Sequence, residues 1–140
     1  MPIFALDVGT RRIGIAVADP SGSFAMPVRV LERTNVRDDI SEIVALLRSY
    51  AADEIVVGDP VTLAGARGIA SKGIDRFVQH LARAFSGTIH RLDERMTTAQ
   101  AQKTLIAADV SRKKRKGVVD QMAAALILES FLARRRNGTL

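Results

Sequence analysis

Apolar positions fall into three short runs before residue 33, separated by glycine, proline or charged residues. The first run, IFALDV at residues 3–8, is apolar on both faces of a strand except for Asp7, because strand side chains alternate between faces. Residues 13–19 follow after a short turn and predict a hairpin. The third run, residues 23–32, contains Pro27, which lacks the amide proton of a central ladder position and therefore indicates an edge strand.

The rest of the chain alternates between helical and strand patterns. Residues 35–52 place apolar side chains at helical spacing after Asn35, a candidate N-cap, and residues 70–85 repeat that spacing. Short apolar runs at 53–60 and 87–94 predict strands, whereas 97–109 and 116–136 predict two further helices. This order predicts an α/β fold with a mixed five-stranded sheet, three antiparallel strands followed by parallel βαβ units, and helices on both faces.

Composition limits the class of protein. The 140 residues predict a single domain over 1–140, and the absence of cysteine excludes a disulfide framework or a thiolate zinc site. With no basic leader and no apolar stretch of membrane-spanning length, we expect a cytoplasmic protein without a membrane partner. An excess of 21 Lys and Arg over 15 Asp and Glu gives a net charge of +6, which favours a polyanionic partner such as nucleic acid.

Three carboxylates stand among apolar neighbours. Asp7 interrupts the first strand, and Glu94 closes the last predicted strand, at the carboxyl end where open α/β sheets place their binding crevices. Asp120 lies four and seven residues before Ala124 and Ile127 on the last predicted helix, so helical spacing turns it toward their apolar face. Acids that converge in a core repel one another unless they are protonated or a cation neutralises them.

Oxygen ligands without cysteine favour Mg²⁺ or Mn²⁺, and two such ions about 4 Å apart can activate water and stabilise a phosphodiester under attack. A basic protein with such an acid cluster is therefore a candidate metal-dependent nuclease. The residues alone leave a second interpretation open, in which all three acids are structural. In that case Asp7 caps the hairpin, Glu94 is an exposed strand end and Asp120 stabilises a helix N-terminus.

Four segments resemble, in order and spacing, the YqgF family of RNase H-like proteins: ALDVGTRRIGIAVAD, EIVVGDP, LDERMTTAQA and KGVVDQMAAALILESFL. Members of that family are described both as pre-16S rRNA nucleases and as Holliday junction resolvases. The resemblance, which runs nearly end to end, implies an RNase H-like sheet, a two-metal phosphodiesterase and maturation of the 5′ end of pre-16S rRNA. It also implies that catalysis and metal binding are carried by Asp7, Glu94 and Asp120.

One loop departs from the family pattern. Family members usually read GLPL followed by an Asn and an Asp, whereas this chain reads GDPVTLAG, with Thr62 and Ala64 at the two polar positions. Substrate contacts in that loop are therefore expected to differ. Asp59 replaces the usual Leu, and turn propensity favours a solvated turn residue there over an additional acid beside the site.

Polar and basic residues near the acids are candidates for binding substrate phosphates. Those in the first turn and beside Glu94 are Thr10, Arg11, Arg12 and Arg95. Five consecutive cations before the last predicted helix predict a solvated basic loop that guides a polyanion to the acids: Arg112, Lys113, Lys114, Arg115 and Lys116. Ordinary turn charge and a merely solubilising loop are the alternative interpretations.

Three other functions compete with an rRNA nuclease. A resolvase would cut branched DNA, and a non-catalytic module would bind nucleic acid through the basic residues alone. The DVGT hairpin also resembles the phosphate-binding strands of actin-like ATPases, but those proteins close two such domains on a nucleotide and 140 residues hold one. Monomer and homodimer both remain compatible with the sequence.

Overall fold

The structure is a computed structural model that describes residues 2–59, 69–94 and 112–138, with side chains described for 2–59, 72–94 and 122–138. The strands are β1 (Ile3–Val8), β2 (Arg12–Ala18), β3 (Ala25–Glu32), β4 (Glu54–Asp59) and β5 (Thr88–Asp93). The helices are α1 (Val36–Ser49), α2 (Ile69–Ala84) and α4 (Arg112–Arg136). The helix predicted over 97–109 lies outside the described residues.

The five strands form one mixed sheet in the order β3-β2-β1-β4-β5. Strand β1 pairs antiparallel with β2 and parallel with β4, while β3 joins β2 antiparallel and β5 joins β4 parallel. The predicted mixed sheet is thus confirmed, and Pro27 lies on an edge strand as expected. The chain's first strand is therefore the centre of the sheet.

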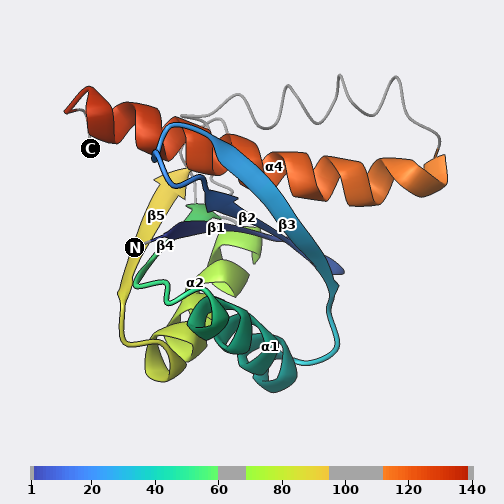
Figure 1. Ribbon diagram of the computed structural model, residues 1–140. Coiled ribbons are helices and arrows are strands. Elements are labelled where there is room, and N and C mark those ends of the chain that lie inside the picture. Colours follow the sequence, from blue (N-terminus) through green and yellow to red (C-terminus); the bar gives the residue numbers. More distant parts are fainter. Residues whose placement is uncertain (1, 60–68, 95–111, 139–140) are drawn as a thin grey trace.

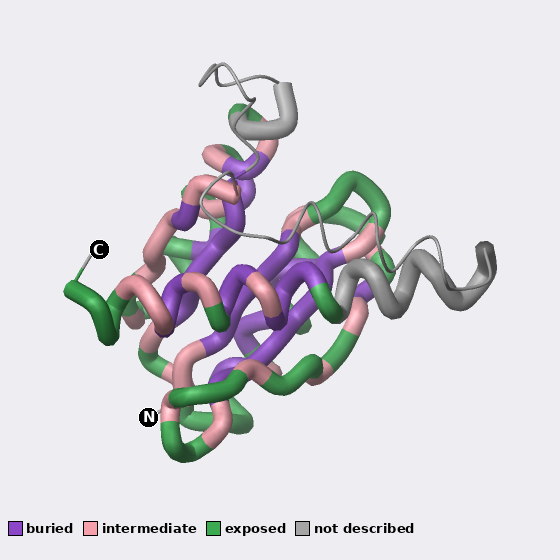
Figure 2. Tube along the Cα trace, turned by 90° about the horizontal axis from the view of Figure 1, so that it is seen from above, coloured by how far each residue is buried: buried purple, intermediate pink, exposed green. Residues whose placement is uncertain are grey.

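Helices cover both faces of this sheet (Figure 1). Beneath α1 and α2 the core is built from large side chains, including Phe4, Leu6, Ile15 and Phe77. Beneath α4 the buried strand residues are mostly small, such as Ala5 and the alanines of β2. Figure 2 looks onto this second side, where buried stretches of the strands cross beneath a helix that is buried along one side. The strands therefore present smaller side chains to α4 than to α1 and α2.

Helix α1 begins as the sequence predicts. Asn35 is its N-cap, and the Asn35 Oδ1 accepts a 2.9 Å hydrogen bond from the Asp38 amide. Ile40, Ile43 and Leu47 follow at helical spacing and are buried against the sheet.

No described helix is both long and apolar enough to cross a membrane.

Helix α4 starts earlier than predicted. The basic run Arg112–Lys116 forms its first turns, so the prediction of a basic loop before the helix is wrong. Lys and Arg are good helix formers, and their helix propensity extends the helix ahead of Gly117. The side chains of this run lie outside the described residues.

The other end of α4 is anchored to the sheet. The Phe131 ring contacts both the His90 ring, 4.8 Å away between centroids, and the Arg135 guanidinium, 4.7 Å from its centroid. Arg135 and His90 both bind the Glu54 carboxylate at the start of β4. Hydrogen bonds from Arg135, and then from His90, lower the pKa of Glu54 against the opposing effect of burial.

Candidate active site

Asp7 lies on the central strand and faces α4. Its side chain is on the same face as Ala5, which belongs to the core beneath that helix, and only 7% of Asp7 is exposed. Its partner on β2 is Gly14, and because Leu6 pairs with Val57 on β4, Gly58 is the next position on the other side. Two residues without side chains, Gly14 and Gly58, therefore flank Asp7 on the neighbouring strands.

Glu94 lies on the same face, directly after β5. A Cβ added to Gly58 would be 2.9 Å from the Glu94 Oε1 and 2.6 Å from the Ile127 Cδ1 of α4. The Glu94 carboxylate thus occupies space that the missing Gly58 side chain leaves, beneath α4. The structure brings Asp7 and Glu94 to one face of the sheet, on either side of Gly58.

Asp120 lies within α4, the helix that covers this face, but its side chain is outside the described residues. Among the side chains that are described, no group of three histidine, cysteine or acidic residues could hold a metal ion. The described part of the candidate site consequently consists of Asp7 and Glu94.

The turn after Asp7 is tightly closed. The Gly9 amide donates a 2.8 Å hydrogen bond to the Arg12 carbonyl oxygen, and a Cβ at Gly9 would lie 2.9 Å from the same oxygen. Arg12 is half-buried and its Nε donates to Glu32 at 2.8 Å. Thr10 and Arg11 are exposed at the tip of the turn, so these two have side chains available to a substrate.

Asp59 is not the solvated turn residue that the sequence predicted. Strand β4 runs through Asp59, which is 6% exposed, and strand alternation turns it away from Gly58 toward α2. Its carboxylate lies 3.2 Å from Arg91 Nη2, and Arg91 also binds Asp75 of α2 at 3.0 Å. Pairing with Arg91 permits the burial, and Asp59 lies on the face of the sheet opposite the candidate site.

Several predicted contacts fall outside the described residues. These are Arg95, the altered loop from Pro60 to Gly65, and the side chains of Arg112, Lys113, Lys114, Arg115 and Lys116.

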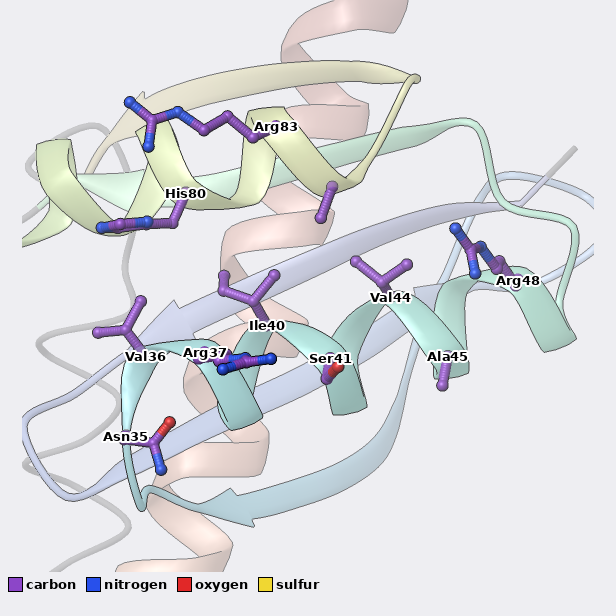
Figure 3. Close-up of a pocket in the computed structure, with 11 residues that line it drawn as sticks. Asn35, Val36, Arg37, Ile40, Ser41, Val44, Ala45, Arg48, His80 and Arg83 are labelled. Carbon is purple, nitrogen blue, oxygen red and sulfur yellow. The ribbon is translucent and has the colours of Figure 1, made fainter.

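A groove of about 1110 Å³ between α1 and α2 was not predicted from the sequence (Figure 3). Arg37, Arg48, His80 and Arg83 line it, and none of the described residues that line it is a carboxylate. Its helices cover the face opposite Asp7 and Glu94, so the groove is separate from the candidate site. In the sequence these residues are only polar positions on two amphipathic helices. Whether they lie together depends on how α1 and α2 pack against each other.

Residues 1–134 match the model of a protein family described as RuvX, Holliday junction resolvase. A protein of Thermoanaerobacter pseudethanolicus named “Putative pre-16S rRNA nuclease” is 41% identical over 138 residues, covering 98% of this chain and 99% of that one. A Desulforudis audaxviator protein with the same name is 39% identical over 138 residues, covering 99% and 98%.

Two solved structures share the fold. The structure of T. thermophilus RuvC in complex with a Holliday junction substrate matches with a TM-score of 0.64 and 12% identity, over 99% of this chain and 98% of that one. The fowlpox virus Holliday junction resolvase matches with a TM-score of 0.52 and 14% identity, over 95% and 99%. At these identities the likeness establishes an RNase H-like, RuvC-like sheet.

Proposed function

This chain belongs to the RuvX family, and on that premise we propose that it is a metal-dependent nuclease that hydrolyses phosphodiester bonds. One observation carries the proposal: a buried carboxylate on the central strand and a second carboxylate after β5 lie on one sheet face, separated by a glycine. Because Gly58 has no side chain, the Glu94 carboxylate can lie over β4 on the face of Asp7, and carboxylates that share a face can share cations.

We propose Asp7, Glu94 and Asp120 as the catalytic and metal-binding residues. The donors are carboxylate oxygens in a chain without cysteine, which fits a hard divalent cation, Mg²⁺ or Mn²⁺. Such a cation supplies water activation and neutralises charge on the phosphodiester oxygens. The backbone of Asp7 is held by the pairing of β1 with β2 on one side and with β4 on the other. Glu94 reaches the same face from the end of β5, the edge strand.

The exposed tip of the first turn is proposed to bind substrate. Thr10 and Arg11 lie three and four residues after Asp7, in the turn between β1 and β2, where a hydroxyl and a guanidinium can donate to phosphate oxygens. Arg12 forms an ion pair with Glu32 through its Nε, and it would position that tip. Arg95 and the cations of Arg112–Lys116 are further proposed phosphate contacts, for which the net charge of +6 is the support.

RNA is the proposed substrate, at the 5′ end of pre-16S rRNA in the cytoplasm. The support is the name shared by relatives of about 40% identity over nearly their full length. Branched DNA is the second candidate, favoured by the description of the family.

Cleavage assays with three labelled substrates test both candidates. A precursor spanning the 16S 5′ end, a four-way DNA junction and an unstructured RNA are each incubated with Mn²⁺, Mg²⁺ or EDTA. We expect cleavage of the precursor only with a divalent ion, and none by Asp7→Asn. Preferential cutting of the junction would replace RNA by DNA as the substrate. If the wild type and Asp7→Asn bind the substrates equally and neither cleaves them, the protein is a non-catalytic nucleic-acid-binding module.

A further inference from the structure

Arg33, in the link between β3 and α1, contacts the turn after Asp7 at two points. Its Nη1 donates a 2.8 Å hydrogen bond to the Gly9 carbonyl oxygen. Its backbone amide donates a 2.8 Å hydrogen bond to the Arg11 carbonyl oxygen. One residue thus holds the turn on both sides of Thr10, the residue at its exposed tip.

The Arg33 guanidinium also contacts α1 and α2, the helices on the sheet face opposite Asp7. Asp39, in the first turn of α1 and only 2% exposed, binds the Arg33 Nε through its Oδ2 at 3.3 Å. The other Asp39 oxygen accepts the Thr34 amide at 3.0 Å, which aligns the carboxylate. The Phe77 ring of α2 lies 5.4 Å from the guanidinium carbon.

A planar guanidinium can serve both partners at once because its donors form a rigid fork. A side chain that stabilised only the packing of α1 would need Asp39 and Phe77 but not a hydrogen bond to a turn carbonyl on another hairpin. The contact to Gly9 therefore links the large-residue core to the turn beside the acids.

We propose that Arg33, oriented by Asp39, is a positioning residue that holds the Gly9–Arg12 turn so that Thr10 and Arg11 meet the substrate phosphate. The assignment rests on the proposed function for the substrate, although the clamp on the turn does not. Asp7 is held by its own strand pairing, so losing the clamp weakens substrate binding and leaves the dependence on metal concentration unchanged.

Three variants and a matched control separate positioning from stability. Arg33→Ala removes the fork, Arg33→Lys keeps the charge without the fork, and Asp39→Asn keeps the acceptor for Thr34 while removing the charge. Arg29→Ala is the control, because Arg29 forms another ion pair between β3 and α1, with Glu42 at 3.6 Å, away from the turn.

Hydrogen exchange of the Gly9 amide measures the clamp without any substrate. We expect Arg33→Ala to speed this exchange by about tenfold, Arg33→Lys and Asp39→Asn by less, and Arg29→Ala not at all. In cleavage assays below the melting transition, Arg33→Ala should raise KM about fivefold or more with little change in kcat or in the metal concentration for half-maximal rate.

Unchanged exchange at Gly9 in Arg33→Ala, or an equal increase in Arg29→Ala, would overturn the clamp. Faster exchange with an unchanged KM would confine Arg33 to stabilising the turn and overturn its positioning role. If the wild-type protein cleaves nothing, the proposed function fails, and the affinity for labelled RNA in EDTA then decides: the same affinity in Arg33→Ala and wild type also rejects positioning.

Discussion

The two faces of the sheet are built differently although the same strands supply both. Neighbouring residues Leu6 and Asp7 illustrate this: Leu6 is fully buried among the large side chains beneath α1 and α2, whereas Asp7 faces α4 among glycines and alanines. Large branched residues fill space and stabilise the fold. Small residues let the Glu94 carboxylate lie over β4 on the same face as Asp7, and this is the face on which we propose the metal site.

Asp7→Asn should produce the largest effect on function. The amide keeps the side chain's volume but loses a charged ligand, so metal-dependent cleavage should fall by about 100-fold or more. The free energy of unfolding in EDTA should stay level or rise, because one member of the proposed acidic cluster is neutralised. Thermal melts in EDTA, read beside cleavage rates in Mn²⁺, check both; early melting with normal cleavage would make Asp7 structural.

Leu6→Ala, one residue away on the other face, should give the opposite result. Truncating a fully buried Leu is expected to lower the free energy of unfolding by about 2–5 kcal/mol. Cleavage per folded molecule should remain near that of the wild type, since the side chain points away from the acids. Urea unfolding and assays at low temperature measure the two quantities, and a lost activity in fully folded Leu6→Ala would mean that the faces are coupled.

Much of this division is visible in the sequence. Strand alternation places Asp7 opposite Leu6, and the end of an apolar run places Glu94 at a strand terminus. The edge position of β3 follows from Pro27. Each of these depends on local sequence, which is why the strands and the face of Asp7 were predictable.

Contacts set by register between distant segments were not predictable. The burial of Asp59 depends on Arg91 lying one strand away, and the sequence does not say which β5 residue comes beside it. The clamp from Arg33 to Gly9 joins residues 24 apart that belong to different hairpin ends. Helix α4 begins earlier than the sequence predicts because the helix propensity of Lys and Arg outweighs the repulsion between the consecutive cations.

Gly58→Ala narrows the space on the α4 face without removing a functional group. The added methyl would clash with the Glu94 carboxylate and the buried Ile127 side chain, so both of these side chains must move. We expect about a tenfold loss of cleavage, because a small displacement of a ligand is costly. Single-turnover rates at saturating Mn²⁺ measure it, and Gly73→Ala, where nothing lies within 4 Å of an added Cβ, is the control.

A smaller effect is expected from pH at the anchored end of α4. The pKa of Glu54 is lowered below its ordinary value near 4.5, so its contribution is present above that pH and is lost as pH falls through the folded-state pKa. In Glu54→Gln, the free energy of unfolding should fall by about 1 kcal/mol less between pH 6 and pH 3 than in the wild type. The figure is small because Arg135 is partly exposed. Denaturant melts from pH 6 to pH 3 test this, with the exposed Glu42→Gln as control.

Changing the groove between α1 and α2 should have the smallest effect. Arg37→Ala with Arg83→Ala removes two exposed cations from the face opposite the acids. Cleavage and RNA affinity should stay within about twofold of the wild type, as for other exposed substitutions. A marked drop in the salt dependence of RNA binding would show instead that the substrate reaches both faces.

The order of elements along the chain also has a consequence for synthesis. The central strand β1 is made first, and α4, which covers its acid-bearing face, is made last. Chains emerge from the ribosome N-terminus first at about 5–20 residues per second, so that face of β1 can be covered only after α4 has been made. A nascent chain from which α4 has not yet emerged therefore lacks the helix that covers Asp7 and Glu94 in the folded protein.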